Sequence, residues 1–137
     1  MSVSLVPYLN FPSGKTREAM TYYQDVFGGE LSVNTFAEFG MEGMPPDGVM
    51  HAQLITDQFT VMASDAMPGA EATWGGTRVY LSLVGDAADT LQTWFARLAA
   101  DGTVSMPLEK QIWGDQYGLV TDKFGLEWMV NIAAPQA

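Results

Sequence analysis

The chain has 137 residues, of which 47% are hydrophobic, so it can bury a core as one domain or as two small, similar halves. Six Lys and Arg residues against 16 Asp and Glu residues give a net charge of -10, which argues against nucleic acid and anionic membranes as partners. There is no cysteine, hence no disulfide or thiolate chemistry, and we see neither a signal peptide nor an apolar run of membrane-spanning length, so we expect a cytoplasmic protein.

The first part of the chain predicts a strand, a helix and three more strands. Residues 3–11 alternate, with Leu5, Leu9 and Phe11 on one face and Val6, Tyr8 and Asn10 on the other. A helix capped by Ser13 or Thr16 is expected over residues 15–27, ending at Gly28 and Gly29. Its apolar stripe consists of Ala19, Met20, Tyr23, Val26 and Phe27. Strands over 30–39, 49–56 and 59–64 follow, with an irregular loop over 40–48.

The second part of the chain repeats this order. We expect a strand over 78–84, a helix capped by Asp86 and ending at Gly102, and strands over 104–112, 118–121 and 126–132. The apolar residues of this helix are Leu91, Trp94, Phe95 and Leu98. Residues 67–76 are the expected linker between a first module over about 1–66 and a second over about 77–133. The sequences echo each other as well, since Tyr8–Phe11 matches Tyr80–Leu83 at an offset of 72 residues (80 − 8). The predicted fold class is α+β, with two βαβββ modules.

Several local motifs occur along these modules in a recognisable order. They are Pro7–Phe11, Tyr22-Tyr23 leading to Val26–Gly29, His51–Leu54, Ser64-Asp65, Trp113–Gly118 and Thr121–Gly125. In this order they resemble the vicinal oxygen chelate superfamily of glyoxalase I, bleomycin-resistance proteins and extradiol dioxygenases, and more closely its PhnB-like subgroup. The resemblance implies a U-shaped mixed sheet with an internal cleft, helices on the outside, and a homodimer.

The strand faces opposite the helices would line that cleft. Such a wall combines apolar area for affinity with a few polar groups for orientation. The expected ligand-binding residues are Tyr8, Asn10, Met62, Ser64, Arg78, Tyr80, Trp113, Tyr117 and Met129. As tentative catalytic residues we take His51, the single histidine, and Glu127, which could exchange a proton if they meet. Asp65 and Asp122 are interpreted mainly as turn formers.

Metal-dependent relatives hold a divalent ion through His or Glu on the first and last strand of each module. By the resemblance and the repeat, these positions fall on Val6, Met62, Arg78 and Met129. None of these suits a hard or borderline divalent ion, because thioethers prefer soft metals and Arg78 is itself a cation. We therefore expect no metal and no other cofactor.

The leading hypothesis is a small-molecule-binding protein of the glyoxalase/bleomycin-resistance type without the family's metal site. A metal-dependent glyoxalase-like lyase or dioxygenase is the alternative, so whether the chain is an enzyme stays open. A third hypothesis is an interaction module whose cleft is filled by its own side chains.

Overall fold

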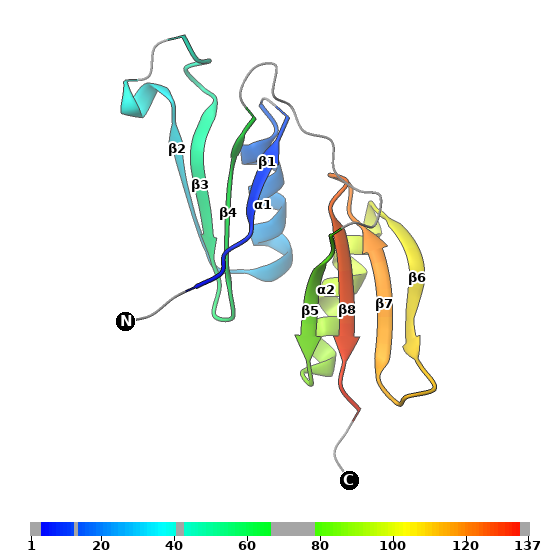
Figure 1. Cartoon of the computed structure of the whole chain (residues 1–137). Helices are drawn as coiled ribbons and strands as arrows, with labels where there is room; N and C mark the ends of the chain where they lie inside the picture. The colour runs from blue at the N-terminus through cyan, green and yellow to red at the C-terminus, as the bar shows by residue number, and fades with distance from the viewer. Residues whose placement is uncertain (1–3, 13, 41–42, 67–78, 135–137) are drawn as a thin grey trace. The chain divides into compact units, whose positions relative to one another are not determined.

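A computed structural model describes residues 4–12, 14–40, 43–66 and 79–134. The chain forms two compact units, Met1–Thr73 and Trp74–Ala137, and each is a βαβββ module with its own four-stranded sheet (Figure 1). The predicted α+β class is confirmed. The expected linker over 67–76 lies outside the described residues, and the joining of both modules into one U-shaped sheet stays a prediction. Within the described ranges, no helix is both long and apolar enough to cross a membrane.

The first unit contains four strands, one α-helix and a short 3-10 helix. Its elements are β1 (Tyr8–Phe11), α1 (Thr16–Phe27), β2 (Glu30–Thr35), η1 (Ala37–Phe39), β3 (Val49–Ile55) and β4 (Thr60–Asp65). The sheet order is β1-β4-β3-β2, with β1 parallel to β4 and the other neighbours antiparallel. The hairpin predicted around Asp57 and Gln58 is confirmed as the β3–β4 connection.

The second unit repeats this topology. Its elements are β5 (Leu81–Gly85), α2 (Ala88–Ala100), β6 (Thr103–Lys110), β7 (Gln116–Thr121) and β8 (Glu127–Ile132). The order β5-β8-β7-β6 again pairs the first and last strands of the module in parallel. In Figure 1 each helix lies against one face of its own sheet, so the opposite face of that sheet carries no element of the same unit.

The predicted helix stripes form the cores. All five residues of the α1 stripe are buried, and the Tyr23 ring lies 6.3 Å from Phe11 and 6.4 Å from Phe27, centroid to centroid. In α2, Leu91, Phe95 and Leu98 are buried. Because burial of large apolar side chains contributes most of the favourable free energy of folding, these contacts hold each helix on its sheet.

Several predicted details are wrong. The first strand begins only at Tyr8, and Leu5, expected in the core, is 99% exposed; Val79, likewise expected to pack inward, is 70% exposed. The strand predicted over 30–39 ends at Thr35, because Phe36 begins the turn that leads into η1.

The predicted helix caps are also wrong. Helix α1 begins after Lys15 and α2 after Ala87, and neither residue caps its helix through a side chain. The Thr16 N–H instead donates to the Asp65 carboxylate at the end of β4 (Oδ1, 3.2 Å). Asp86 contributes its backbone carbonyl, which accepts from Ala88 N–H at 2.9 Å. Ser13 lies outside the described residues.

Equivalent glycines fix the register of the repeat. A Cβ on Gly29 would collide with the carbonyl oxygen of Ile55, and one on Gly102 would collide with that of Thr121. These contacts make Ile55 equivalent to Thr121, two strands later in each module, at an offset of 66 residues (121 − 55).

Strand pairing then corrects the offset between the first strands of the modules. Ile55 pairs with Thr60 and Thr121 with Glu127, so Thr60 corresponds to Glu127 and Met62 to Met129. Since Tyr8 pairs with Met62 and Ser82 with Met129, the first strands are offset by 74 residues (82 − 8), not by 72. The sequence match of Tyr8 with Tyr80 is therefore slipped by two residues, which keeps the same sheet face.

Candidate functional site

The sheet of the first unit has an open face opposite α1. Strand pairing places Tyr8, Met62 and Gln53 in one row across β1, β4 and β3, and Asn10 beside Ser64 in the next row. The residues that alternate with them point toward the helix and are buried: Leu9, Phe11, Ala52, Leu54, Val61 and Ala63. Of the nine predicted ligand-binding residues, Tyr8, Asn10, Met62 and Ser64 are thus brought together on one surface.

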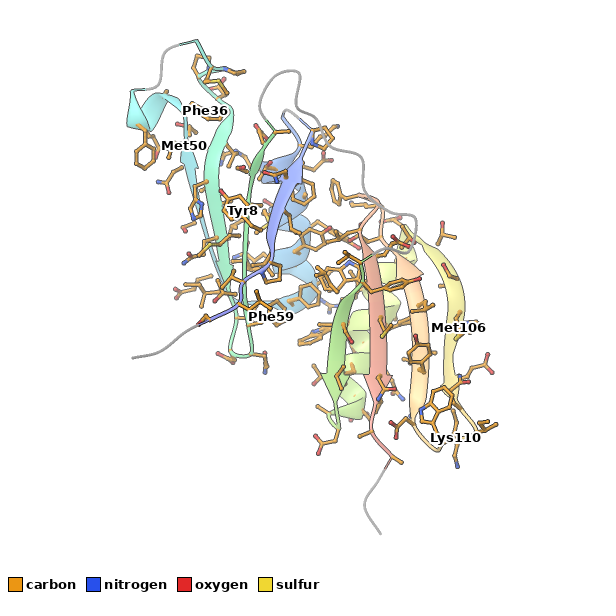
Figure 2. All side chains as sticks on the ribbon, viewed as in Figure 1. Tyr8, Phe36, Met50, Phe59, Met106 and Lys110 are labelled. Carbon is orange, nitrogen blue, oxygen red and sulfur yellow. The ribbon has the colours of Figure 1, made fainter. Side chains whose placement is uncertain are left out.

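Tyr8 and His51 contact each other on this face. The Tyr8 side chain, labelled in Figure 2, reaches from β1 over β4 to β3, where its hydroxyl oxygen lies 3.3 Å from His51 Nδ1. The ring centroids are 5.8 Å apart and the planes are tilted by 37°. Tyr8 is 47% exposed and His51 is half-buried, so both are accessible to a molecule lying on the sheet. This pairing was not predicted, because the sequence does not reveal that β4 lies between β1 and β3.

The same face carries hydrogen-bonding groups and negative charge. Ser64 Oγ donates to Asn10 Oδ1 at 3.3 Å, and Asn34 Nδ2 donates to Glu38 Oε2 at 3.2 Å. Glu30 shares the face, since it pairs with Ile55. The sequences of the four strands contain no Lys or Arg.

The second unit has a corresponding open face with a different composition. Ser82, Met129, Leu119 and Met106 form one row across its sheet. Tyr117 pairs with Asn131 in the neighbouring row, and Trp113 packs edge-on against Tyr117 with 6.0 Å between ring centroids. Trp113 is 57% exposed, whereas Tyr117 is half-buried. Trp113, Tyr117 and Met129 are therefore on or beside one surface, Tyr80 immediately precedes β5, and Arg78 lies outside the described residues.

Asp115 is an important residue of this unit that was not predicted. Its Oδ1 accepts from Ala134 N–H at 2.8 Å and its Oδ2 from Asn131 Nδ2 at 3.1 Å, so it ties the turn before β7 to the end of β8. The Asn131 hydrogen bond and then the Ala134 hydrogen bond lower the pKa of Asp115, against a smaller opposing effect of burial. The only sequence signal was an aspartate within Trp113–Gly118.

Two other aspartates have structural roles. Asp65 is not a turn former, because it is buried at the end of β4 and accepts hydrogen bonds from Thr16 N–H and Val49 N–H, the latter at 2.9 Å. Asp122 is a turn former, as predicted, since Oδ1 accepts from Phe124 N–H at 2.8 Å and from Leu126 N–H at 3.1 Å. Both carboxylates are used in holding the fold.

The two tentative catalytic residues belong to different units. His51 lies on β3 of the first unit and Glu127 opens β8 of the second. Each is half-buried on the open face of its own sheet. Their predicted meeting stays a prediction, whereas the Tyr8 contact of His51 lies within one unit.

The corrected repeat register changes one of the four positions at which metal-dependent relatives hold their ion. With an offset of 74 residues, the counterpart of Val6 is Tyr80 (80 − 6) rather than Arg78. The positions are then occupied by Val6, Met62, Tyr80 and Met129. Within the described ranges, no three His, Asp or Glu side chains form a group that could hold a metal ion.

Comparison with known proteins places this architecture in a family. The family model described as Glyoxalase/Bleomycin resistance protein/Dioxygenase superfamily matches residues 6–130. The chain is 34% identical to Protein YjdN of Escherichia coli over 145 residues, covering 96% of this chain and 97% of that protein.

Solved structures show the same fold over nearly the whole chain. Protein PA1353 from Pseudomonas aeruginosa is 36% identical, with a TM-score of 0.79 and coverage of 98% of this chain and 100% of the other. The PhnB protein from Bacillus cereus is 24% identical, with a TM-score of 0.75 and coverage of 96% and 100%, a likeness of fold alone. The chain belongs to the glyoxalase/bleomycin resistance protein/dioxygenase superfamily.

Proposed function

We propose that this protein binds a small, amphipathic, uncharged or cationic molecule, and that it does so without the metal ion used by other members of its superfamily. The superfamily fold supports a ligand-binding protein of this type. The observation that carries the proposal is the open face of the first sheet, where Tyr8, His51 and Met62 combine apolar area with hydrogen-bonding groups. Ligand sites typically have this composition, with apolar area for affinity and a few polar groups for orientation.

The chemistry of the side chains at the metal positions supports the metal-free part of the proposal. A divalent ion of the kind used for Lewis-acid chemistry requires carboxylate, imidazole or water oxygen ligands. Met62 and Met129 offer only thioether sulfur, and Val6 offers no donor. This set does not fit Mg, Mn, Ni or Zn, so we derive no reaction step through a metal.

Charge supports the proposed class of ligand. Glu30 and Glu38 are on or next to the open face, no strand of that sheet contains Lys or Arg, and the whole chain carries a net charge of -10. An anionic ligand would meet repulsion there, whereas a neutral or cationic one would not.

Thermal melts of the full chain test this proposal. Because a ligand that binds only the folded state raises the melting temperature, we expect a shift with the neutral aromatic dye Nile red and none specific to Mn, Ni, Zn or Fe(II). Tyr8→Ala should weaken dye binding, whereas the control Phe39→Ala, which removes a 56% exposed aromatic from η1, should not. A large shift with one metal, lost in Glu127→Gln or His51→Ala, would instead establish the metal-dependent alternative.

A further inference from the structure

We propose that the Tyr8 hydroxyl holds His51 in the neutral tautomer that carries its proton on Nε2, so that the open face presents an N–H donor to a neutral acceptor oxygen, a ketone or an amide, on an aromatic ligand. This inference rests on the proposed function and deepens it, since it names a positioning residue and a ligand class. Tyr8 acts through His51 and is not itself the group that selects the acceptor.

The first step of the argument is the direction of the Tyr8–His51 hydrogen bond. A neutral imidazole has one N–H donor and one acceptor nitrogen, and the partner of one nitrogen decides which tautomer is present. The Tyr8 hydroxyl lies 3.3 Å from Nδ1, and among the described residues it has no other hydrogen-bond partner. A phenol that donates to Nδ1 makes that nitrogen the acceptor, so the imidazole proton resides on Nε2.

The second step concerns what His51 Nε2 can bind. Within the described part of the chain, the only hydrogen bond of the His51 ring is the one at Nδ1, so Nε2 is available to a ligand. The half-buried position of His51 on β3 leaves the ring partly open to solvent. A fixed N–H donor on a partly desolvated surface favours a ligand that brings an acceptor, because an unmet donor costs free energy.

The third step limits the acceptor to an uncharged one. Carboxylates and phosphates are also good acceptors, but recognition of these anions relies on Arg or Lys, and the strands of this sheet have neither. Glu30 and Glu38 add negative charge near the same face. Met62, in the row beside Tyr8, supplies an adaptable apolar surface for a ring.

The tautomer is directly measurable because His51 is the single histidine. In histidine-15N-labelled protein at pH 8, above the usual imidazole pKa of about 6.5, we expect an acceptor-type Nδ1 signal and an N–H-type Nε2 signal. Tyr8→Phe should move both shifts toward those of an unconstrained imidazole, whereas the control Tyr117→Phe, on the other unit, should leave them unchanged. A proton on Nδ1 in the native protein, or tautomer shifts that do not respond to Tyr8→Phe, would overturn the inference.

Paired ligands test the proposed class. Acetophenone and ethylbenzene present similar rings, but only acetophenone carries a carbonyl acceptor. One hydrogen bond contributes about 1 kcal/mol, so we expect about fivefold tighter binding of acetophenone. This preference should disappear in His51→Ala. Equal affinity for both ligands would overturn the inference while leaving the proposed function intact, whereas no binding of either would overturn both.

Discussion

The indole N–H of Trp128 donates to the Asp122 carboxylate over 2.8 Å, inside the second module. The same carboxylate accepts two backbone N–H groups of the β7–β8 turn, so it joins that turn to the first buried side chain of β8. The first module solves the same turn differently, since Thr56 Oγ1 accepts from the N–H groups of Gln58 and Phe59. Only the second module therefore depends on a buried charge at this place.

Asp122→Asn should lower the free energy of unfolding by about 2 kcal/mol. An amide retains one acceptor oxygen but replaces the other with an N–H₂ group, so at least one buried donor is left without a partner. Denaturant unfolding would measure the loss. The control is Asp57→Asn in the turn of the first module, where the side chain is exposed and the expected change is within about 0.5 kcal/mol. Equal losses in the two variants would contradict this role of Asp122.

Thr16→Val should be neutral or slightly stabilising, contrary to what a helix-capping threonine would give. Thr16 Oγ1 is buried and has no hydrogen-bond partner among the described residues, so removing the hydroxyl removes an unmet group without changing the shape of the side chain. Loss of a true cap would cost about 1 kcal/mol. Asp65→Asn, which affects the group that does bond to the start of α1, should cost about 2 kcal/mol. Equilibrium unfolding of both variants distinguishes the two explanations, and a costly Thr16→Val would restore threonine capping.

Three alanine substitutions should separate backbone strain from steric collision. Gly28 has a φ of 78° but open space around it, so Gly28→Ala should cost about 1 kcal/mol. Gly29 combines a φ of 96° with a collision at Ile55, so about 3 kcal/mol is expected. Gly102→Ala meets the collision at Thr121 without positive φ and should cost about 2 kcal/mol. Melting temperatures in this order would support the repeat register, whereas a tolerated Gly102→Ala would contradict it.

The stabilising effect of Asp115 should depend on pH. Its pKa is lowered in the folded protein by the hydrogen bonds from Asn131 and Ala134, so the ionised form favours folding. This contribution is present above the unfolded-state pKa of about 3.9 and is lost as the pH falls through the lower folded-state value. The melting temperature of Asp115→Asn should therefore lie below that of the native protein at pH 7 and converge with it in acid. A difference that is constant from pH 7 to pH 3 would contradict this explanation.

The sequence predicted the features that depend on periodicity. Ala19, Tyr23 and Phe27 recur at helical spacing, and β8 alternates strictly, so both cores were predictable. Strand ends were not, because Leu5 and Val79 continue an apolar alternation beyond the point where any strand pairs with them. Contacts between strands that are not consecutive, such as Tyr8 with His51, require the sheet order, and the carboxylate partners of Asp65 and Asp115 are likewise tertiary.

The internal repeat illustrates the same limit. Tyr8 and Tyr80 match in sequence, but pairing register makes Ser82 the counterpart of Tyr8. Period-two alternation identifies the face of a strand correctly and leaves a slip of two residues undetected. Only the contacts of Gly29 and Gly102 with the strands beside them fixed the offset.

The central claim, ligand binding without a metal, is tested most directly by Mn(II) titration of protein labelled with 13C at its methionine methyl groups. An ion at the family position would lie among the side chains of Met62 and Met129, and its unpaired electrons would broaden those two methyl signals first. We predict that both signals broaden no more than that of Met106, on the edge strand β6, while addition of acetophenone shifts the Met62 signal. Selective, saturable loss of the Met62 and Met129 signals at substoichiometric Mn(II) would contradict the proposal.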